Sequence, residues 1–155
     1  MKRRLPIICV LLSAAMFAGL LMMNWFSKPP SNLGVSNGKL AACPESPNGV
    51  RTQAARETQK MEPISFTGDT AAVMERIKTV VGSTPRTRIT EESETYLRSE
   101  FTTAIMRFID DVEFFIDEDA KLIHFRSASR IGYSDMNANR KRMTELVKKF
   151  REMQL

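Results

Sequence analysis

The chain has 155 residues, with 23 basic and 18 acidic side chains, which gives a formal net charge of +5. Residues 61–155 hold 15 of the basic and 16 of the acidic side chains, so the excess positive charge lies before residue 61. A duplex-binding protein needs a basic face on its folded domain, and one histidine with two cysteines gives too few ligands for a usual zinc site. The composition therefore predicts neither nucleic acid as a partner nor a metal or cofactor.

Residues 1–26 predict a signal anchor. Three basic residues at positions 2–4 precede an uncharged stretch from Leu5 to Phe26, which would reach about 33 Å as a helix and so cross a hydrocarbon core of about 30 Å. The small residues Ser13-Ala14-Ala15 leave a cleaved signal peptide as the alternative. Basic residues ahead of the span favour a cytoplasmic amino end. We therefore expect a single-pass protein of the cytoplasmic membrane with its carboxyl-terminal domain in the periplasm or outside the cell.

Residues 27–60 are rich in Pro, Ser, Asn, Gly and Gln and show no sustained apolar period, which predicts a flexible tether. The tether contains the segment Cys-Pro-x-Ser-Pro-Asn, which begins at Cys43. Because Cys9 falls in the predicted membrane helix and Cys43 outside it, no internal disulfide is expected. The role of Cys43 stays open.

Residues 61–155 predict one α+β domain. A short strand at 63–66 is followed by a helix from Thr70 to about Val81, for which Asp69 is the expected cap. Period-two alternation predicts strands at 86–90 and 96–101, and a hairpin at 112–116 and 122–126. A last helix is expected to start near Ser134-Asp135. The predicted fold is a small antiparallel sheet in the order β-α-β-β-β-β-α with two helices on one face, preceded by a transmembrane helix and a flexible tether.

A polar cluster is predicted where the hairpin ends and the last helix begins. Asp110 shares the strand face of Val112 and Phe114, so it needs a partner if that face is buried. The arginines of the next strand and loop are the expected counter-charges. The candidate ligand-binding residues are Asp110, Arg126, Arg130, Tyr133, Asp135 and Arg140. Two interpretations stay open: Arg130 and Arg140 brace the loop against Asp110 or Asp135, or the cluster holds a small external anion.

The other titratable groups are explained by structure rather than by chemistry. His124 lies mid-strand, between Ile123 and Phe125, where a surface or lightly packed position is expected. The run Asp117-Glu118-Asp119 lacks the spacing of a calcium loop and is read as a hairpin turn. Residues 91–119 are strongly acidic and residues 121–155 strongly basic, so the two blocks can attract each other within the fold or between copies. The basic block is interpreted as a solvated helix face. The alternative is an external partner: anionic lipid, a small anion or an envelope protein. The oligomeric state stays open.

Four separated segments carry a family resemblance. They are Cys43 to Asn48, Tyr96 to Phe101, Phe108 to Phe114, and Arg126 to Asp135 with Asn139-Arg140. Together they resemble the bacterial and plastid family called domain of unknown function 1499, over about residues 40–152. That family typically has a second cysteine where this chain has Gly49, so a paired-cysteine role is not expected. The resemblance implies no activity.

The functional hypothesis is a membrane-anchored, outward-facing binding or accessory module of the bacterial cell envelope. The alternative is a hydrolase or transferase that acts on a small anionic substrate through the cluster of Asp110, Arg126, Arg130, Tyr133 and Asp135. A second alternative is a pocket for an apolar ligand, suggested by the phenylalanines of the hairpin. Whether the protein is an enzyme stays open, and no catalytic residue is assigned.

Overall fold

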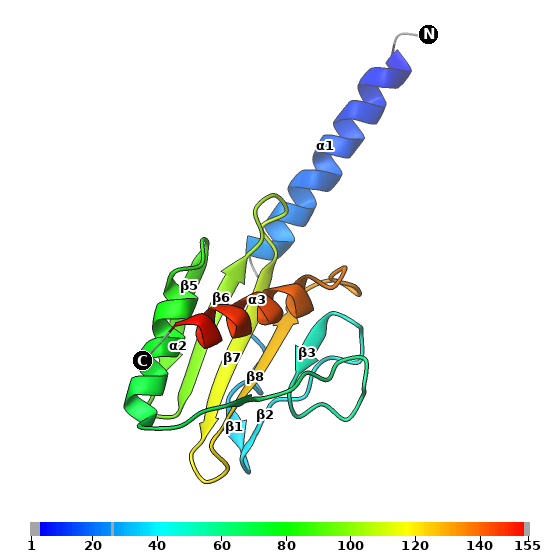
Figure 1. Cartoon of the computed structure of the whole chain (residues 1–155). Helices are drawn as coiled ribbons and strands as arrows, with labels where there is room; N and C mark the ends of the chain where they lie inside the picture. Colours follow the sequence, from blue (N-terminus) through cyan, green and yellow to red (C-terminus); the bar gives the residue numbers. More distant parts are fainter. Residues whose placement is uncertain (1–3, 26, 154–155) are drawn as a thin grey trace.

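A six-stranded sheet forms the centre of the domain (Figure 1). The computed structural model describes residues 4–25 and 27–153. Its elements are α1 (Arg4–Trp25), β1 (Val35–Ser36), β2 (Lys39–Leu40), β3 (Gly49–Arg51), β4 (Ile64–Ser65), α2 (Thr70–Gly82), β5 (Thr87–Glu92), β6 (Tyr96–Thr102), β7 (Ile109–Asp117), β8 (Leu122–Ser129) and α3 (Ala138–Glu152). From β4 to α3 the elements follow the predicted order β-α-β-β-β-β-α.

The strands of this sheet pair in the order β3-β8-β7-β6-β5, and β4 also pairs with β8. All of these pairs are antiparallel. β3 pairs with β8 near its carboxyl end, at Arg126 to Ala128, whereas β4 pairs with Leu122 and Ile123 at its start. The predicted α+β class and antiparallel sheet are confirmed.

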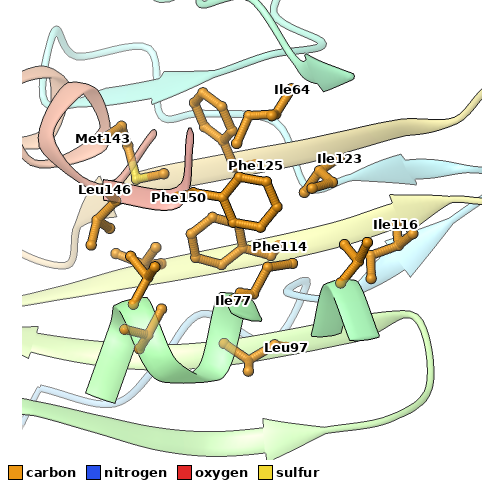
Figure 2. Close-up of a cluster of buried hydrophobic side chains, with 14 of the residues drawn as sticks. Ile64, Ile77, Leu97, Phe114, Ile116, Ile123, Phe125, Met143, Leu146 and Phe150 are labelled. Atoms are coloured by element: carbon orange, nitrogen blue, oxygen red, sulfur yellow. The ribbon is translucent and has the colours of Figure 1, made fainter. Parts of the chain in front are cut away.

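Helices α2 and α3 cover one face of the sheet (Figure 1). Asp69 caps α2 as predicted, because its carboxylate accepts a hydrogen bond from Ala72 N at 3.2 Å. The core lies between the two helices and alternate residues of the strands, as Figure 2 shows for ten labelled side chains. Those side chains are Ile64, Ile77, Leu97, Phe114, Ile116, Ile123, Phe125, Met143, Leu146 and Phe150. The helices therefore bury the central part of one sheet face, while Ile89 of the edge strand β5 stays partly exposed.

The chain between α1 and β3 contacts the opposite face of the sheet. Gly34 N donates to Glu113 Oε1 at 2.7 Å, and Arg126 Nε donates to Ala42 O at 3.4 Å. Residues 27–60 thus carry structure that the prediction of a flexible tether did not include, with β1 and β2 paired together and β3 in the main sheet. These strands have only two or three residues, which is too short for a hydrophobic period to be recognised in the sequence.

The prediction of a transmembrane helix ahead of the α+β domain was wrong, and the predicted fold class is corrected on this point. Within residues 4–25 and 27–153, no helix combines the length and the apolar character that crossing a membrane requires. The prediction rested on the reach of an uncharged stretch at helical rise. Reach alone is not sufficient, because a span also needs apolar character along its whole length.

Candidate functional site

The six candidate residues do not form one cluster, because the sheet separates them. In the register of β7 and β8, Asp110 lies opposite Ser129 on the face covered by the helices. Arg126 lies opposite Glu113, and this pair faces the other way because neighbouring strand residues alternate between faces. The two groups therefore meet different partners and are described separately.

On the helix side, the buried Asp110 pairs with Arg142 of α3. Arg142 Nη2 donates to Asp110 Oδ2 at 2.5 Å, and Arg142 Nη1 donates to Asn139 Oδ1 at 2.6 Å. The predicted counter-charges, Arg126 and Arg130, do not contact this carboxylate. The expectation of a partner was therefore right, but the partner comes from the helix packed above the strand.

A buried amide network joins two of the sequence segments that carry the family resemblance. Asn139 is fully buried, and its Nδ2 donates to Asn48 O at 3.0 Å, Ser129 Oγ at 3.0 Å and Asp135 Oδ2 at 2.8 Å. Asn48 Nδ2 in turn donates to Gly132 O at 2.7 Å. The network ties the segment before β3 to the loop between β8 and α3. Buried groups with this many partners hold a loop in one conformation.

Asp135 stabilises the start of α3, although the N-cap residue of this helix is Asn137. The helix begins at Ala138, later than the predicted start near Ser134-Asp135, and Asn137 adopts a left-handed conformation with φ 64°. The Asp135 carboxylate accepts hydrogen bonds from Asn137 N at 3.0 Å and Asn139 N at 2.8 Å. A negative charge at this end of a helix is stabilised by the backbone donors. Asp135 thus acts as an internal anion.

A small pocket of about 140 Å³ lies beside this network. It is lined by Pro47, Gly49, Val50, Thr58, Asp135, Asn137 and Arg140. Arg140 Nη1 donates to Lys60 O at 3.1 Å, and Arg140 Nη2 donates to Thr58 O at 2.8 Å. Within the described ranges, no carboxylate forms an ion pair with Arg140. Of the six candidates, Asp135 and Arg140 are the two that line this pocket.

On the opposite face, Arg130 bridges two acidic side chains. Its Nε donates to Asp111 Oδ2 at 2.8 Å and its Nη2 donates to Asp111 Oδ1 at 2.7 Å and to Glu100 Oε1 at 2.5 Å. Burial alone would lower the pKa of Arg130, but the hydrogen bonds to Asp111 and Glu100 raise it above its usual value. Of the two interpretations left open, the brace thus agrees with the structure for Arg130, but the expected partners Asp110 and Asp135 were wrong, because Asp111 and Glu100 are the acidic partners.

Arg126 is likewise paired, with the fully buried Glu113. Arg126 Nη1 donates to Glu113 Oε2 at 3.1 Å, while Tyr96 Oη and Gly34 N donate to the other carboxylate oxygen at 2.9 and 2.7 Å. Burial and the neighbouring Glu113 raise the pKa of Tyr96, so this phenol is a neutral donor. Every oxygen of Glu113 has a partner inside the protein.

Cys43 lies near the same pair of charges. Burial raises the pKa of its thiol, although Arg126 and Arg51 oppose the shift, so the thiol is protonated at neutral pH. Both cysteines are free. A Cβ at Gly49 would lie 2.8 Å from Ala128 Cβ, so any larger residue at this position of β3 would require β3 or β8 to shift. The structure shows no thiol partner for Cys43 among its described residues.

The remaining candidates do not assemble a reactive site. His124 is half-buried, stacks on Phe115, and has Thr52 Oγ1 at 3.0 Å from its Nδ1. Burial lowers the pKa of His124, opposed by Asp117. Tyr133 is exposed and does not line the pocket at Arg140. Within the described part of the chain, no group of three His, Cys, Asp or Glu side chains is arranged to hold a metal ion.

The partners that the sequence analysis missed are Asp111, Glu113, Glu100, Arg142 and Asn139. One signal for them was present. If the turn after Asp117 pairs that residue with Leu122, the hairpin register places Glu113 opposite Arg126. Arg142 was recognisable as sharing a helix face with Asn139 and Met143. Its contact with Asp110 depends on how α3 crosses the sheet, for which the sequence has no signal.

A family model described as "Protein of unknown function (DUF1499)" matches residues 39–150. No curated protein matches the chain. The matched range covers most of the chain and includes β3, the whole sheet and nearly all of α3. The chain belongs to this family, as the resemblance implied.

Proposed function

We propose that this DUF1499 protein is a binding or accessory module of the bacterial cell envelope and not an enzyme. The observation that supports the proposal most directly is the separation of Asp110 from Arg126 and Arg130. These arginines are almost completely buried, and each is neutralised by carboxylates of its own sheet face. An active site needs its charged groups to face one space that a substrate can enter.

A small-anion site is the second candidate, because Arg140 lies in a pocket at the start of α3 without an acidic ion-pair partner among the described residues. Backbone donors at a helix start and a guanidinium without a carboxylate partner both favour anions. Asp135 opposes such a ligand, since its carboxylate already occupies the donors of Asn137 and Asn139. The pocket at Asp135 and Arg140 is the one part of the predicted cluster that still supports the hydrolase or transferase alternative.

The apolar-ligand alternative has little support. The ring of Phe114 packs against Phe125, with the ring centroids 6.4 Å apart. The cavity between Phe114 and the helices measures about 10 Å³, roughly the space of a single water molecule. Phe115 lies on the other face with His124. Phe114 therefore fills its part of the core. The larger hollow of about 440 Å³, which Phe125 lines together with Met61 and Val147, is open to the surface and rimmed by charged side chains of α3.

The two leading candidates differ in how the protein responds to inorganic phosphate. If phosphate binds at Arg140 and reaches 100 times its dissociation constant, the native state gains about 2.7 kcal/mol, which raises the melting temperature by roughly 5–10 °C. We expect no such saturable shift in the full chain. Arg140→Gln should then respond to phosphate as the wild type does.

Lys141→Gln is the matched control, because it removes the same charge from the adjacent, exposed position of α3. A saturable phosphate-dependent shift that Arg140→Gln abolishes and Lys141→Gln retains would favour the small-anion site, and with it the hydrolase or transferase alternative, over a module that is not an enzyme. It would make the pocket a specific anion site.

The envelope location has its own test. The pattern that supports it is the group of basic residues at positions 2–4 ahead of an apolar stretch, which is typical of exported bacterial proteins. A reporter that is active only outside the cytoplasm, fused after Leu155, is expected to be active. Activity of a cytoplasm-only reporter at the same position would contradict the envelope location.

A further inference from the structure

Three segments meet at one end of the sheet. The pairs Thr102 with Ile109 and Asp110 with Ser129 place the loop at 103–108 and the loop at 130–137 at the same end. Arg130 Nη1 donates to Ser27 O at 3.1 Å, so the chain that leaves α1 also reaches this end. Figure 1 shows α1 extending from the domain beside these two loops. We refer to residues 27–28, 103–108 and 130–137 as the loop end.

The loop end carries the most exposed large apolar side chains of the domain. Ile105 is 78% exposed, Tyr133 78% and Met136 88%. Outside α1, the described residues contain one other exposed large apolar side chain, Val35, and Figure 1 places its strand β1 away from this end. Exposed apolar groups gathered on neighbouring loops mark an interaction surface.

The tips of these loops are held in place. Thr103 N donates to Phe108 O at 2.9 Å and Phe108 N donates to Thr103 Oγ1 at 2.8 Å, which closes the first loop around Ile105. The second loop is tied down by the hydrogen bond of Asn48 to Gly132. Because the loops are already ordered, little conformational freedom is lost when their tips are buried.

The exposed charged residues of the loop end are basic, which favours an anionic partner. Lys28 and Arg107 are exposed here, and the single acidic residue of the loop end, Asp135, is engaged with the start of α3. α1, which leaves from this end, also exposes apolar side chains: Ile8, Val10, Leu11, Leu12, Met16 and Met22. Apolar tips flanked by basic groups match a bilayer surface, where acyl chains lie beneath anionic phosphates.

We propose that the loop end lies against an anionic lipid surface, with Ile105, Tyr133 and Met136 in the interfacial layer and Lys28 and Arg107 at the phosphates. Tyrosine is enriched at membrane interfaces because its ring is apolar and its hydroxyl polar. This proposal rests on the envelope location proposed above, and it adds a lipid surface as the partner of the domain there. It assigns the lipid contact to the domain's own loops.

Hydrogen exchange of the full chain on vesicles tests the proposal, because it separates the loops from α1. On phosphatidylcholine vesicles with about a third phosphatidylglycerol, amides of residues 103–108 and 131–137 are expected to exchange at least about fivefold more slowly than without lipid. Amides of β1 and β2 should exchange at the same rate in both states. The slowing should be lost on neutral vesicles.

Substitutions provide the second measurement. The triple variant Ile105→Ser, Tyr133→Ser, Met136→Ser is expected to lose the protection and to lower the vesicle partition coefficient at least about tenfold. Val35→Ser is the matched control and should stay within about twofold of the wild type. Because all four side chains are exposed, the melting temperatures should be unchanged.

Three results would overturn the inference. The chain could bind vesicles while the amides of both loops exchange as fast as without lipid, which would assign vesicle binding to another part of the chain. Equal protection on neutral vesicles would remove the role of Lys28 and Arg107. Protection without lipid that grows with protein concentration would identify a second copy as the partner. These vesicle results do not depend on the reporter fusion, so failure of the lipid contact and failure of the envelope location can be told apart.

Discussion

Replacing Arg130 by alanine is expected to lower the free energy of unfolding by about 3–5 kcal/mol, because it leaves the buried Asp111 carboxylate without its counter-charge. The Arg130 side chain is 4% exposed and the Asp111 side chain 1% exposed. Glu100 loses one of its two arginine partners and keeps Arg88. It also holds the loop end to the chain after α1 through Ser27 O. Urea unfolding of the full chain at neutral pH measures the loss.

Arg88→Ala is the matched control, because Arg88 pairs with the same carboxylate. Arg88 Nη2 donates to Glu100 Oε2 at 2.8 Å, but its side chain is 74% exposed. Exposed pairs contribute about 0–1 kcal/mol, so this variant should remain close to the wild type. Equal losses at the two positions, or a loss at Arg130 below about 1 kcal/mol, would contradict the brace.

The pH dependence of the same measurement identifies Glu100 as one of the partners. Burial alone would raise the pKa of Glu100, but hydrogen bonds from Arg88 and Arg130 lower it below its usual value. A lowered folded-state pKa stabilises the protein above the unfolded-state pKa, and the contribution is lost as the pH falls through the folded-state value. The stability gap between wild type and Arg130→Ala should therefore narrow as the pH falls below about 4.5. A gap that is constant down to low pH would exclude Glu100 as a partner.

The local pattern of the sequence was sufficient to predict most elements of the domain. Val73, Ile77 and Val80 recur at helical spacing and all are buried in α2. The alternation in β6 and in the hairpin also matches the observed strands. Strand β7 runs from Ile109 to Asp117, so it includes the buried Asp110 and Asp111, which are neutralised by Arg142 and Arg130. The neutralising arginines come from different elements, so the sequence pattern around the aspartates does not show them.

The candidate site was predicted only in part, because its contacts join distant segments. Arg142 and Asp110 are 32 residues apart, and Asn139 and Asn48 are 91 apart. Which residues meet over such separations depends on the crossing of α3 over the sheet and on the pairing of β3 with β8. Neither arrangement follows from the period of a single segment. The expectation that a buried Asp110 needs a partner relied on the energy of buried charge, and Asp110 does pair with Arg142. The brace by Arg130 was one of two open interpretations, and the partners expected for it, Asp110 or Asp135, were wrong.

Phe114→Ala is expected to lower the free energy of unfolding by about 3–5 kcal/mol, since it deletes a buried ring and leaves a cavity. Phe114 lies in the central strand β7, between the helices and Phe125, as Figure 2 shows. It is almost fully buried and contacts a core in which the adjoining cavity is already small. The neighbours are anchored on strands and helices, so they cannot collapse into the space of a whole ring.

Phe115→Ala is the matched control, because it removes the same ring from the next residue of the same strand. Phe115 faces the other side of the sheet, is half-buried, and stacks on His124 with the ring centroids 6.2 Å apart. We expect it to cost less than about 2 kcal/mol, because a half-exposed ring loses less apolar area on truncation. Urea unfolding of both full-length variants makes the comparison. Equal losses at the two positions, or a smaller loss at Phe114, would mean that the helices do not cover the face of β7 on which Phe114 lies.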